Sequence, residues 1–256
     1  TFRIINFPDL TCDGSFTLGA AVSAVMIKSN YDPWVCVIAS VIAGGVAGLL
    51  TGALNVWLKI EDLLAGIIVA FMLYSINLRI MGANPNITLL DYKTIFSGGD
   101  DALVTIGVLV FALAAIVAYV LSTDFGLGLR SVGQNRTFAS ACGVNTNAMI
   151  LVGLAASNAL IGMCGAMFSQ YQGFCDVSQG VGCLVIGLAS VIVGEKLLIF
   201  RNVAWGIVAC IIGSVAYRIF IAFAVNSDIF GLKTQDLNLI TGLMIIAIMA
   251  RKKCCK

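Results

Sequence analysis

Long apolar segments constrain the fold of this chain more than any other feature of its sequence. A helix that crosses the ~30 Å hydrocarbon layer needs about 20 mostly apolar residues. Eight segments approach or exceed this length: 15–28, 34–58, 63–79, 102–121, 149–168, 181–194, 203–225 and 237–250. Charged residues make up only 11% of the chain, against roughly 25% in soluble domains. The sequence therefore predicts an all-α, polytopic integral membrane protein, and it excludes a soluble enzyme.

Two of these segments are too short to cross ~30 Å of hydrocarbon comfortably, so each either crosses fully or is re-entrant. Helices over 15–28 and 181–194 would each rise about 21 Å at 1.5 Å per residue. They also begin alike, with Phe-Pro-Asp-Leu-Thr before the first and Phe-Cys-Asp-Val-Ser before the second. Because inverted repeats with short helices are typical of transporters, we expect an inverted internal repeat. Chance similarity between Gly- and Ala-rich helices is the alternative.

The basic residues predict the orientation of the chain. If the C-terminus is cytoplasmic and each segment crosses once, ten Lys and Arg residues lie inside and four lie outside. This asymmetry favours a multi-pass protein with its C-terminus in the cytoplasm. A net charge of +2 gives no electrostatic footprint for nucleic acid.

The longest polar break between spans covers residues 122–148 and is expected to be cytoplasmic. Gly133-Gln134-Asn135 predicts a turn, residues 137–142 can form a short helix, and Gly143 can cap it in the left-handed conformation. A short amphipathic helix in such a loop is suited to a groove on a partner protein. An ordinary solvated loop is the alternative.

Polar residues and glycines in or beside the spans are candidates for a solute path. The candidates are Asp9, Thr11, Gly14, Tyr74, Asn77, Asn158, Gln172, Asp176, Ser178 and Gly182. Their side chains could equally bond across helices, and the Asp, Thr and Ser before the short helices could be N-caps. Gly44, Gly48 and Gly52 share one helical face, which predicts close packing either within one subunit or across a dimer seam.

The residue types and motifs that the sequence lacks limit the kinds of metal, catalytic and nucleotide site that we expect. There is no histidine, and the nine cysteines contain no C-x-x-C pair, so we expect no metal site and no catalytic centre. No G-x-x-x-x-G-K-[ST] motif is present, so we expect no bound cofactor and ATP held only by a separate chain. Two alternatives to an ATP-driven transporter stay open: an ion-gradient-driven secondary transporter, and, less favoured, an intramembrane enzyme.

Three blocks of the chain, residues 6–21, 63–82 and 157–198, resemble the permease subunits of bacterial ABC importers. The resemblance is to the branched-chain amino acid and ribose permeases, and more closely to the uncharacterised or tryptophan/tyrosine-type permeases. It implies one permease domain over 1–256, with halves 1–121 and 149–250 joined by the coupling loop 122–148. Family members usually begin one apolar helix earlier, so we expect an N-terminal helix to be missing from this numbering.

The resemblance also implies partners and a coupling site. Residues Gly133, Gln134, Asn135, Arg136, Ala139 and Gly143 match the loop whose helix sits in the ATPase. Relatives often carry proline or glutamate where this chain has Arg136. The implied partners are a cytoplasmic ATPase, an extracytoplasmic solute-binding protein, a second permease copy and membrane lipid. The implied location is the bacterial cytoplasmic (inner) membrane. The residues themselves leave sugars, nucleosides and amino acids open as the small solute, and the resemblance favours an amino acid, of the aromatic type.

Overall fold

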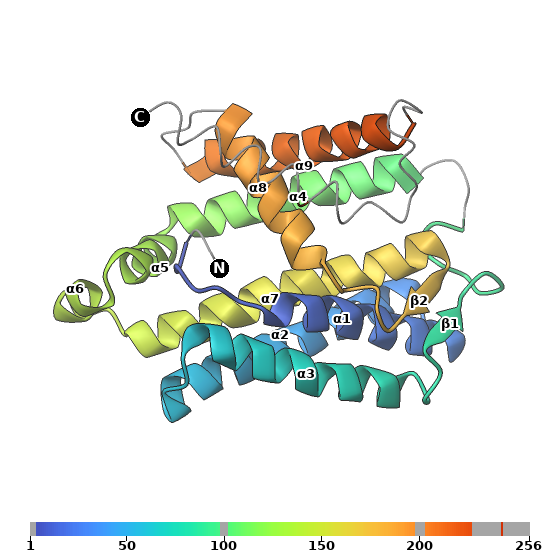
Figure 1. Cartoon of the computed structure of the whole chain (residues 1–256), viewed down its shortest axis with the longest axis horizontal. Helices are drawn as coiled ribbons and strands as arrows, with labels where there is room; N and C mark the ends of the chain where they lie inside the picture. The colour runs from blue at the N-terminus through green and yellow to red at the C-terminus, as the bar shows by residue number, and fades with distance from the viewer. Residues whose placement is uncertain (1–3, 98–101, 198–202, 227–241, 243–256) are drawn as a thin grey trace. The chain divides into compact units, whose positions relative to one another are not determined.

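The structure is a computed structural model that describes residues 4–97, 102–197, 203–226 and Gly242. The described part is almost wholly helical, with one small two-stranded sheet (Figure 1). The helices are α1 (Thr11–Lys28), α2 (Pro33–Leu58), α3 (Asp62–Ile80), α4 (Ala102–Ser122), α5 (Asp124–Gln134), α6 (Arg136–Ala141), α7 (Thr146–Gln172), α8 (Cys183–Leu197) and α9 (Val203–Asn226). The strands are β1 (Asn86–Thr88) and β2 (Phe174–Asp176). The mostly helical fold class is confirmed, and the short sheet is a departure from it.

Five of the described helices are long and apolar enough to cross a membrane: α2, α3, α4, α7 and the Trp205–Phe223 part of α9. With 18 and 15 residues, α1 and α8 rise about 27 and 22 Å, below the ~30 Å of the hydrocarbon layer. α1 begins four residues earlier than predicted, at Thr11, whose backbone N–H donates to Oδ1 of Asp9. Segment 237–250 lies outside the described residues apart from Gly242, so the total of eight helices stays a prediction.

Local sequence signals account for several helix ends. Asp32 caps α2 by accepting a hydrogen bond from the backbone N–H of Trp34 at 2.9 Å, and Pro33 occupies the first helical position. The Asn145 side chain caps α7 in the same way at 3.2 Å. α7 ends at Gln172, and Gly173 caps it with a left-handed φ of 75°. These are the residue types preferred at helix starts and ends.

The described residues form two compact units. The first comprises Thr1–Ala112 and Val120–Val181, and the second comprises Leu113–Tyr119 and Gly182–Lys256. α4 therefore contributes to both units. No residue in its most apolar stretch is buried within the structure, as expected of a helix whose surroundings are lipid.

α1 is the central helix of the first unit. It packs against α2, α3, α7 and β2, and 11 of its 18 residues are buried. Most of the buried residues are Gly, Ala, Ser or Thr, which let helix backbones approach closely. A Cβ on Gly19 would lie only 2.0 Å from the carbonyl oxygen of Gly162 in α7. The backbones of α1 and α7 thus touch at this glycine pair.

The glycines spaced by four in α2 face α7 of the same chain. A Cβ on Gly44 would lie 2.4 Å from the carbonyl oxygen of Asn158, and a Cβ on Gly48 would lie 2.3 Å from that of Leu154. Gly52 also faces α7. Of the two predicted alternatives for these glycines, packing within one subunit is confirmed.

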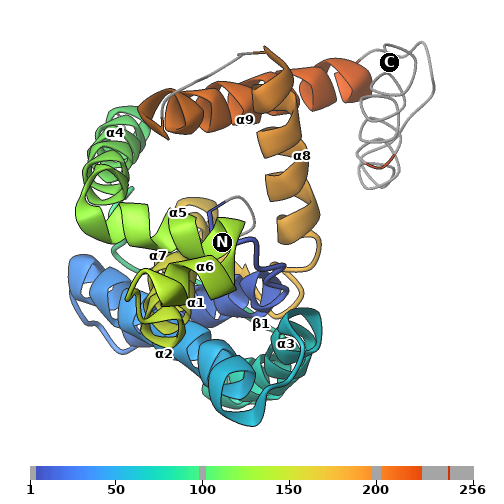
Figure 2. The ribbon, with the colours of Figure 1, turned by 90° about the vertical axis from the view of Figure 1, so that its left-hand side faces the viewer.

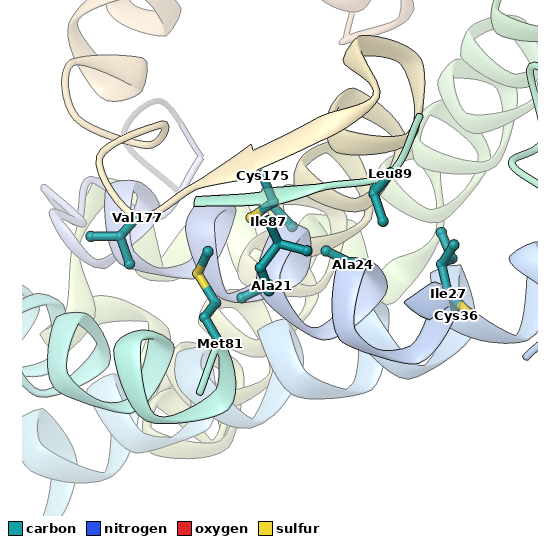
Figure 3. Packing of buried hydrophobic residues seen from close by; sticks show 10 residues of the cluster. Ala21, Ala24, Ile27, Cys36, Met81, Ile87, Leu89, Cys175 and Val177 are labelled. Carbon is teal, nitrogen blue, oxygen red and sulfur yellow. The ribbon is translucent and has the colours of Figure 1, made fainter. Parts of the chain in front are cut away.

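A small antiparallel sheet covers one end of the first unit. β1 pairs with β2, and Ile87 lies opposite Cys175. Ile87 and Cys175 form one buried cluster with Ala24 and Ile27 of α1 and with Leu89 (Figure 3). These strands were not predicted from the sequence, because three residues are too few to show an alternating pattern. α6 lies at the opposite end of this bundle, and Figure 2 views the bundle from the α6 end.

The two lead-in segments that look alike in sequence fold differently. Residues 6–9, before α1, have no regular secondary structure, whereas Phe174–Asp176 is a strand. The second segment pairs with β1, and within the described ranges no strand pairs with the first. The inverted repeat stays a prediction.

The second unit is built on close contact between α8 and α9. A Cβ on Gly194 would lie 2.1 Å from the carbonyl oxygen of Ala209, and one on Gly213 would lie 2.2 Å from that of Ser190. These glycines therefore permit backbone contact between the two helices.

Candidate functional site

The short helix predicted in the polar loop is α6. Asn135 begins it, because its Oδ1 accepts a hydrogen bond from the backbone N–H of Phe138 at 3.0 Å. The backbone N–H of Gly143 donates to the carbonyl oxygen of Ser140 at 3.0 Å, and the next N–H closes the second bond of a Schellman motif. Gly143 has a left-handed φ of 85°. The prediction of a glycine-capped helix in this loop is confirmed.

The predicted turn at 133–135 is wrong for its first two residues. α5 continues to Gln134, and only Asn135 leaves the helical conformation. Gly133 serves packing instead, since a Cβ there would lie 2.0 Å from the carbonyl oxygen of Ile4. The N-terminal segment can cross α5 only over a residue that has no side chain.

An apolar cluster anchors α5 and α6 to the rest of the first unit. Ile5 and Phe7 from the N-terminal segment join Val132 of α5, Ala139 of α6 and Ile150 of α7, and all five are buried. Ala139 is the one buried residue of α6. The remaining residues of the helix face outward, and Phe138 is 65% exposed. An exposed aromatic ring on a capped, anchored helix is suited to contact with a partner protein.

Arg136 connects α6 to the start of α3. Its guanidinium donates to Oδ2 of Asp62 at 2.6 Å, and Nδ2 of Asn55 donates to Oδ1 of the same carboxylate at 2.6 Å. Because the Arg136 side chain is 43% exposed, the ion pair contributes only about 0.2–1 kcal/mol. A cavity of about 430 Å³ beside the pair is also lined by Lys59 and Glu61. α6 is thus in direct contact with the α2–α3 connection.

Asp9, Thr11 and Asn158, three of the predicted path residues, belong to a buried polar cluster. Oδ1 of Asp9 accepts from the N–H of Thr11 at 2.9 Å, and Oδ2 accepts from Nδ2 of Asn158 at 2.7 Å. The Thr11 and Thr51 hydroxyls share a hydrogen bond of 2.7 Å. All four residues are buried. The cluster holds together the start of α1, α2 and α7.

This cluster sets the depth at which α1 begins. Asn158 is the thirteenth of the 27 residues of α7, so the first turn of α1 lies beside the middle of a spanning helix. The non-helical residues before it pack against α5 and α7. Such backbone is tolerated at membrane depth only where protein or a water-filled cavity surrounds it. The meeting of α1 and α8 at this depth stays a prediction.

Three other path candidates, Gly14, Tyr74 and Asn77, line a cavity of about 480 Å³ beside the first turns of α1. Asp13 and Phe71 line it as well. Nδ2 of Asn77 donates to the carbonyl oxygen of Gly14 at 3.3 Å. Oδ1 of Asn77 is buried and has no hydrogen-bond partner in the described part of the chain. The hydrogen bond from Asn77 to Gly14 thus joins α3 to α1 in the wall of the cavity.

The remaining path candidates lie at the end of α7 or after it, and they line neither cavity. Oδ1 of Asp176 accepts hydrogen bonds from the backbone and hydroxyl of Ser178, and Oε1 of Gln172 accepts from the Gln179 side chain at 3.1 Å. Gly182 has a left-handed φ of 85°. The interpretation of Asp176 and Ser178 as caps of the second short helix is wrong, because α8 begins later, at Cys183.

Sequence reasoning missed two contributors to these sites, the carboxylate of Asp62 beneath α6 and the ring of Phe71 in the cavity. A signal for the second was present: Ile67, Phe71 and Tyr74 recur at helical spacing on one face of α3 and all line the cavity. No such signal joins Asp62 to Arg136, which is 74 residues away. Among the residues that the structure describes, no group of three Cys, Asp or Glu could hold a metal ion.

Comparison with known proteins places the chain in a family. Residues 1–249 match the family model described as branched-chain amino acid transport system / permease component. The tyrosine transport system permease protein of Clostridioides difficile (strain R20291) is 39% identical over 250 residues, covering 98% of this chain and 83% of that protein. An uncharacterized protein of Rickettsia prowazekii (strain Madrid E) is 32% identical over 259 residues, covering 99% and 90%.

A more distant relative is the nucleoside ABC transporter permease protein NupC of Lactococcus lactis subsp. cremoris (strain MG1363). It is 26% identical over 245 residues, covering 86% of this chain and 74% of that protein. No solved structure matches the chain. With a family match over almost its whole length, and with five helices fit to span a membrane, the chain belongs to the branched-chain amino acid transport permease family of ABC transporters.

Proposed function

We propose that this chain is the membrane-spanning permease subunit of an ATP-driven ABC importer, and that its solute is an amino acid of the tyrosine type. The observation that carries the proposal is the geometry of α6, a capped helix that is anchored through Ala139 and presents Phe138 outward. The match to a tyrosine transport permease supports the solute class. ATP is held by a partner chain, since this sequence has no phosphate-binding loop.

α6 is connected to the bundle in a way that can transmit motion. It is fixed to α7 and the N-terminal segment by the apolar cluster, and to α3 by the Arg136–Asp62 ion pair. A partner that moves α6 therefore displaces α3 and α7 together. In our proposal, closure of the ATPase drives this displacement, and the two halves of the permease rock to expose the solute path alternately. The chain itself makes and breaks no covalent bond.

The basic residues of the whole chain carry the orientation, because the charge count places ten Lys and Arg inside and four outside. The first unit alone does not decide it: Lys59, Arg130 and Arg136 lie after α2, in α5 and in α6, and Lys28, Arg79 and Lys93 lie at the ends of α1 and α3 and after β1. The count over the whole chain favours α6 and the C-terminus in the cytoplasm. A solute-binding protein would then dock outside, at the sheet end. We propose a bacterial inner-membrane complex in which a second permease copy completes the path.

Co-purification tests the role of α6. Phe138→Ala should lower the affinity for the ATPase by about tenfold or more, as removal of a central aromatic anchor does, and should lower solute-stimulated ATP hydrolysis in parallel. Phe111→Ala is the matched control, because Phe111 is also exposed, 77%, but lies on the apolar helix α4.

Equal loss in both variants, or in neither, would contradict the docking role of α6. Uptake by the chain alone, driven by an ion gradient and indifferent to ATP, would instead establish the secondary-transporter alternative.

A further inference from the structure

We propose that the 480 Å³ cavity beside α1 is the site at which the chain holds its solute, an aromatic amino acid. In this site the Asp13 carboxylate binds the ammonium group, and the ring lies against Phe71 and Tyr74. The proposal rests on the proposed import function and adds to it a location and a recognition chemistry.

The cavity lies at the depth where a transporter needs a solute site. Asp13 is the third residue of α1, and the Asp9–Asn158 hydrogen bond fixes the start of α1 beside the middle of α7. Phe71 and Tyr74 are the tenth and thirteenth residues of the 19-residue α3. Solute sites of transporters lie near the bilayer midplane, where short or broken helices begin. Both walls of the cavity are in the first unit.

The charge in the wall selects the solute class. Asp13 is the charged residue among the side chains that line the cavity. An ionisable side chain at membrane depth is costly in lipid, and it is retained where a solute, water or a polar partner reaches it. Its two oxygens offer about four acceptor sites, so the carboxylate can accept from a substrate ammonium in addition to protein donors. A solute that carries only a negative charge would be repelled.

The remaining wall suits a ring better than a sugar. Most of the lining is apolar, with contributions from Leu10, Ile67 and Val177, whereas a sugar would need several hydrogen-bonding groups. Rings that stack or meet edge to face gain energy beyond their buried area, and Phe71 and Tyr74 are positioned to provide such contacts. The volume falls in the ~300–1,000 Å³ range of small-molecule pockets.

Two residues shape the polar side of the cavity. A Cβ on Gly14 would lie 3.0 Å from the Leu73 side chain, so glycine lets α1 and α3 approach here without filling the space between them. Asn77 donates to the Gly14 carbonyl oxygen, next to Asp13, while its own Oδ1 lacks a partner in the described part. The wall thus combines polar groups of Asp13, Thr17 and Asn77 with apolar side chains.

Thiol-reagent accessibility tests the site without depending on ATP. Ile67→Cys and Ala70→Cys, two lining positions outside the proposed ammonium and ring contacts, are made separately in a full-length parent whose native cysteines are replaced by alanine, and each is placed in lipid nanodiscs. A cationic methanethiosulfonate should react about tenfold faster than an anionic one, relative to Asn84→Cys in an exposed loop. Adding Asp13→Asn should remove this preference. Millimolar tyrosine should slow the reaction, and 3-(4-hydroxyphenyl)propionate, which lacks the ammonium group, should not.

The labelling rates either support or overturn the solute site. Equal rates for the two reagents, or no protection by tyrosine, would overturn it. Slow reaction with both reagents at both positions would show that this wall faces lipid, and would overturn it too. ATP-driven uptake is measured separately in the complex with the ATPase. Uptake without protection at the cavity refutes the site alone, and protection without ATP-driven uptake refutes the proposed function alone.

Discussion

Replacing Asp9 by alanine should destabilise the first unit more than the loss of an ordinary helix cap, because its carboxylate serves two helices at once. Asp9 is only 3% exposed. Its removal leaves the Thr11 N–H and one N–H of the Asn158 amide without an acceptor, although Asn158 keeps its bond to the Leu154 carbonyl oxygen at 3.1 Å. A hydrogen bond to a charged group contributes about 1.5–3 kcal/mol. The expected loss is about 3–5 kcal/mol, against ~1 kcal/mol for a typical cap.

Asp9→Asn should be milder, for a reason specific to this cluster. The new side chain keeps an oxygen for Thr11 but turns an NH₂ group toward the NH₂ group of Asn158. Asn158 can rotate its amide and present Oδ1, which has no partner among the described residues. The rotation sacrifices the bond to Leu154, so the expected loss is about 1–2 kcal/mol.

Thermal unfolding of the purified chain in detergent, followed by gel filtration, measures both effects. A loss of 1 kcal/mol shifts the midpoint by about 2–4 °C for a chain near this size, so Asp9→Ala should lower it by ~6–20 °C and Asp9→Asn by ~2–8 °C. Asp91→Ala, in an exposed loop, is the control and should shift it little. If Asp9→Ala behaves like Asp91→Ala, or if Asp9→Asn is as harmful as alanine, the reasoning from this cluster fails.

Three further predictions follow from single contacts. Gly48→Leu should abolish folding or lower the midpoint more than Gly107→Leu, because a Cβ at Gly48 meets backbone at 2.3 Å and one at Gly107 meets nothing within 4 Å; equal midpoints would contradict the α2–α7 contact. Gly143→Val should weaken ATPase association while the chain stays folded, since a β-branched residue is strained at φ 85° by roughly 1–2 kcal/mol; unchanged association would show that this cap is dispensable. Burial raises the pKa of the Cys175 thiol to about 12, so between pH 7 and 9 this thiol should stay protonated and resist N-ethylmaleimide while exposed Cys142 reacts. Mass spectrometry of the labelled peptides measures the difference. The stability that the folded state gains from this raised pKa is lost only as the pH rises from about 9 through 12.

The sequence determined the features that depend on neighbouring residues. Long apolar runs predicted α2, α3, α4, α7 and α9, because a spanning helix must satisfy its backbone internally whatever surrounds it. The capped helix α6 was predictable because its caps are local: the hydrogen bonds at its start at Asn135 and at its end at Gly143 join residues three to five positions apart. That α1 and α8 are shorter than a full membrane crossing was also predictable, from the number of residues in the apolar segments 15–28 and 181–194.

Tertiary structure decided which faces of these helices meet. Gly133 was predicted to lie in a turn, but it lies in α5 and serves packing, because the backbone at Ile4 crosses the helix there. Asp9 looked like a cap and proved also to hold Asn158, 149 residues away.

Tertiary structure also decided both candidate sites, the exposed helix α6 and the cavity beside α1. The ion pair beneath α6 joins residues 74 positions apart, and the cavity is formed where α1 and α3 meet. Helix periodicity fixes which residues share a face, but which two faces touch depends on the fit of small and large side chains along the whole interface. That fit belongs to pairs of distant segments, so no local pattern in the sequence could reveal it.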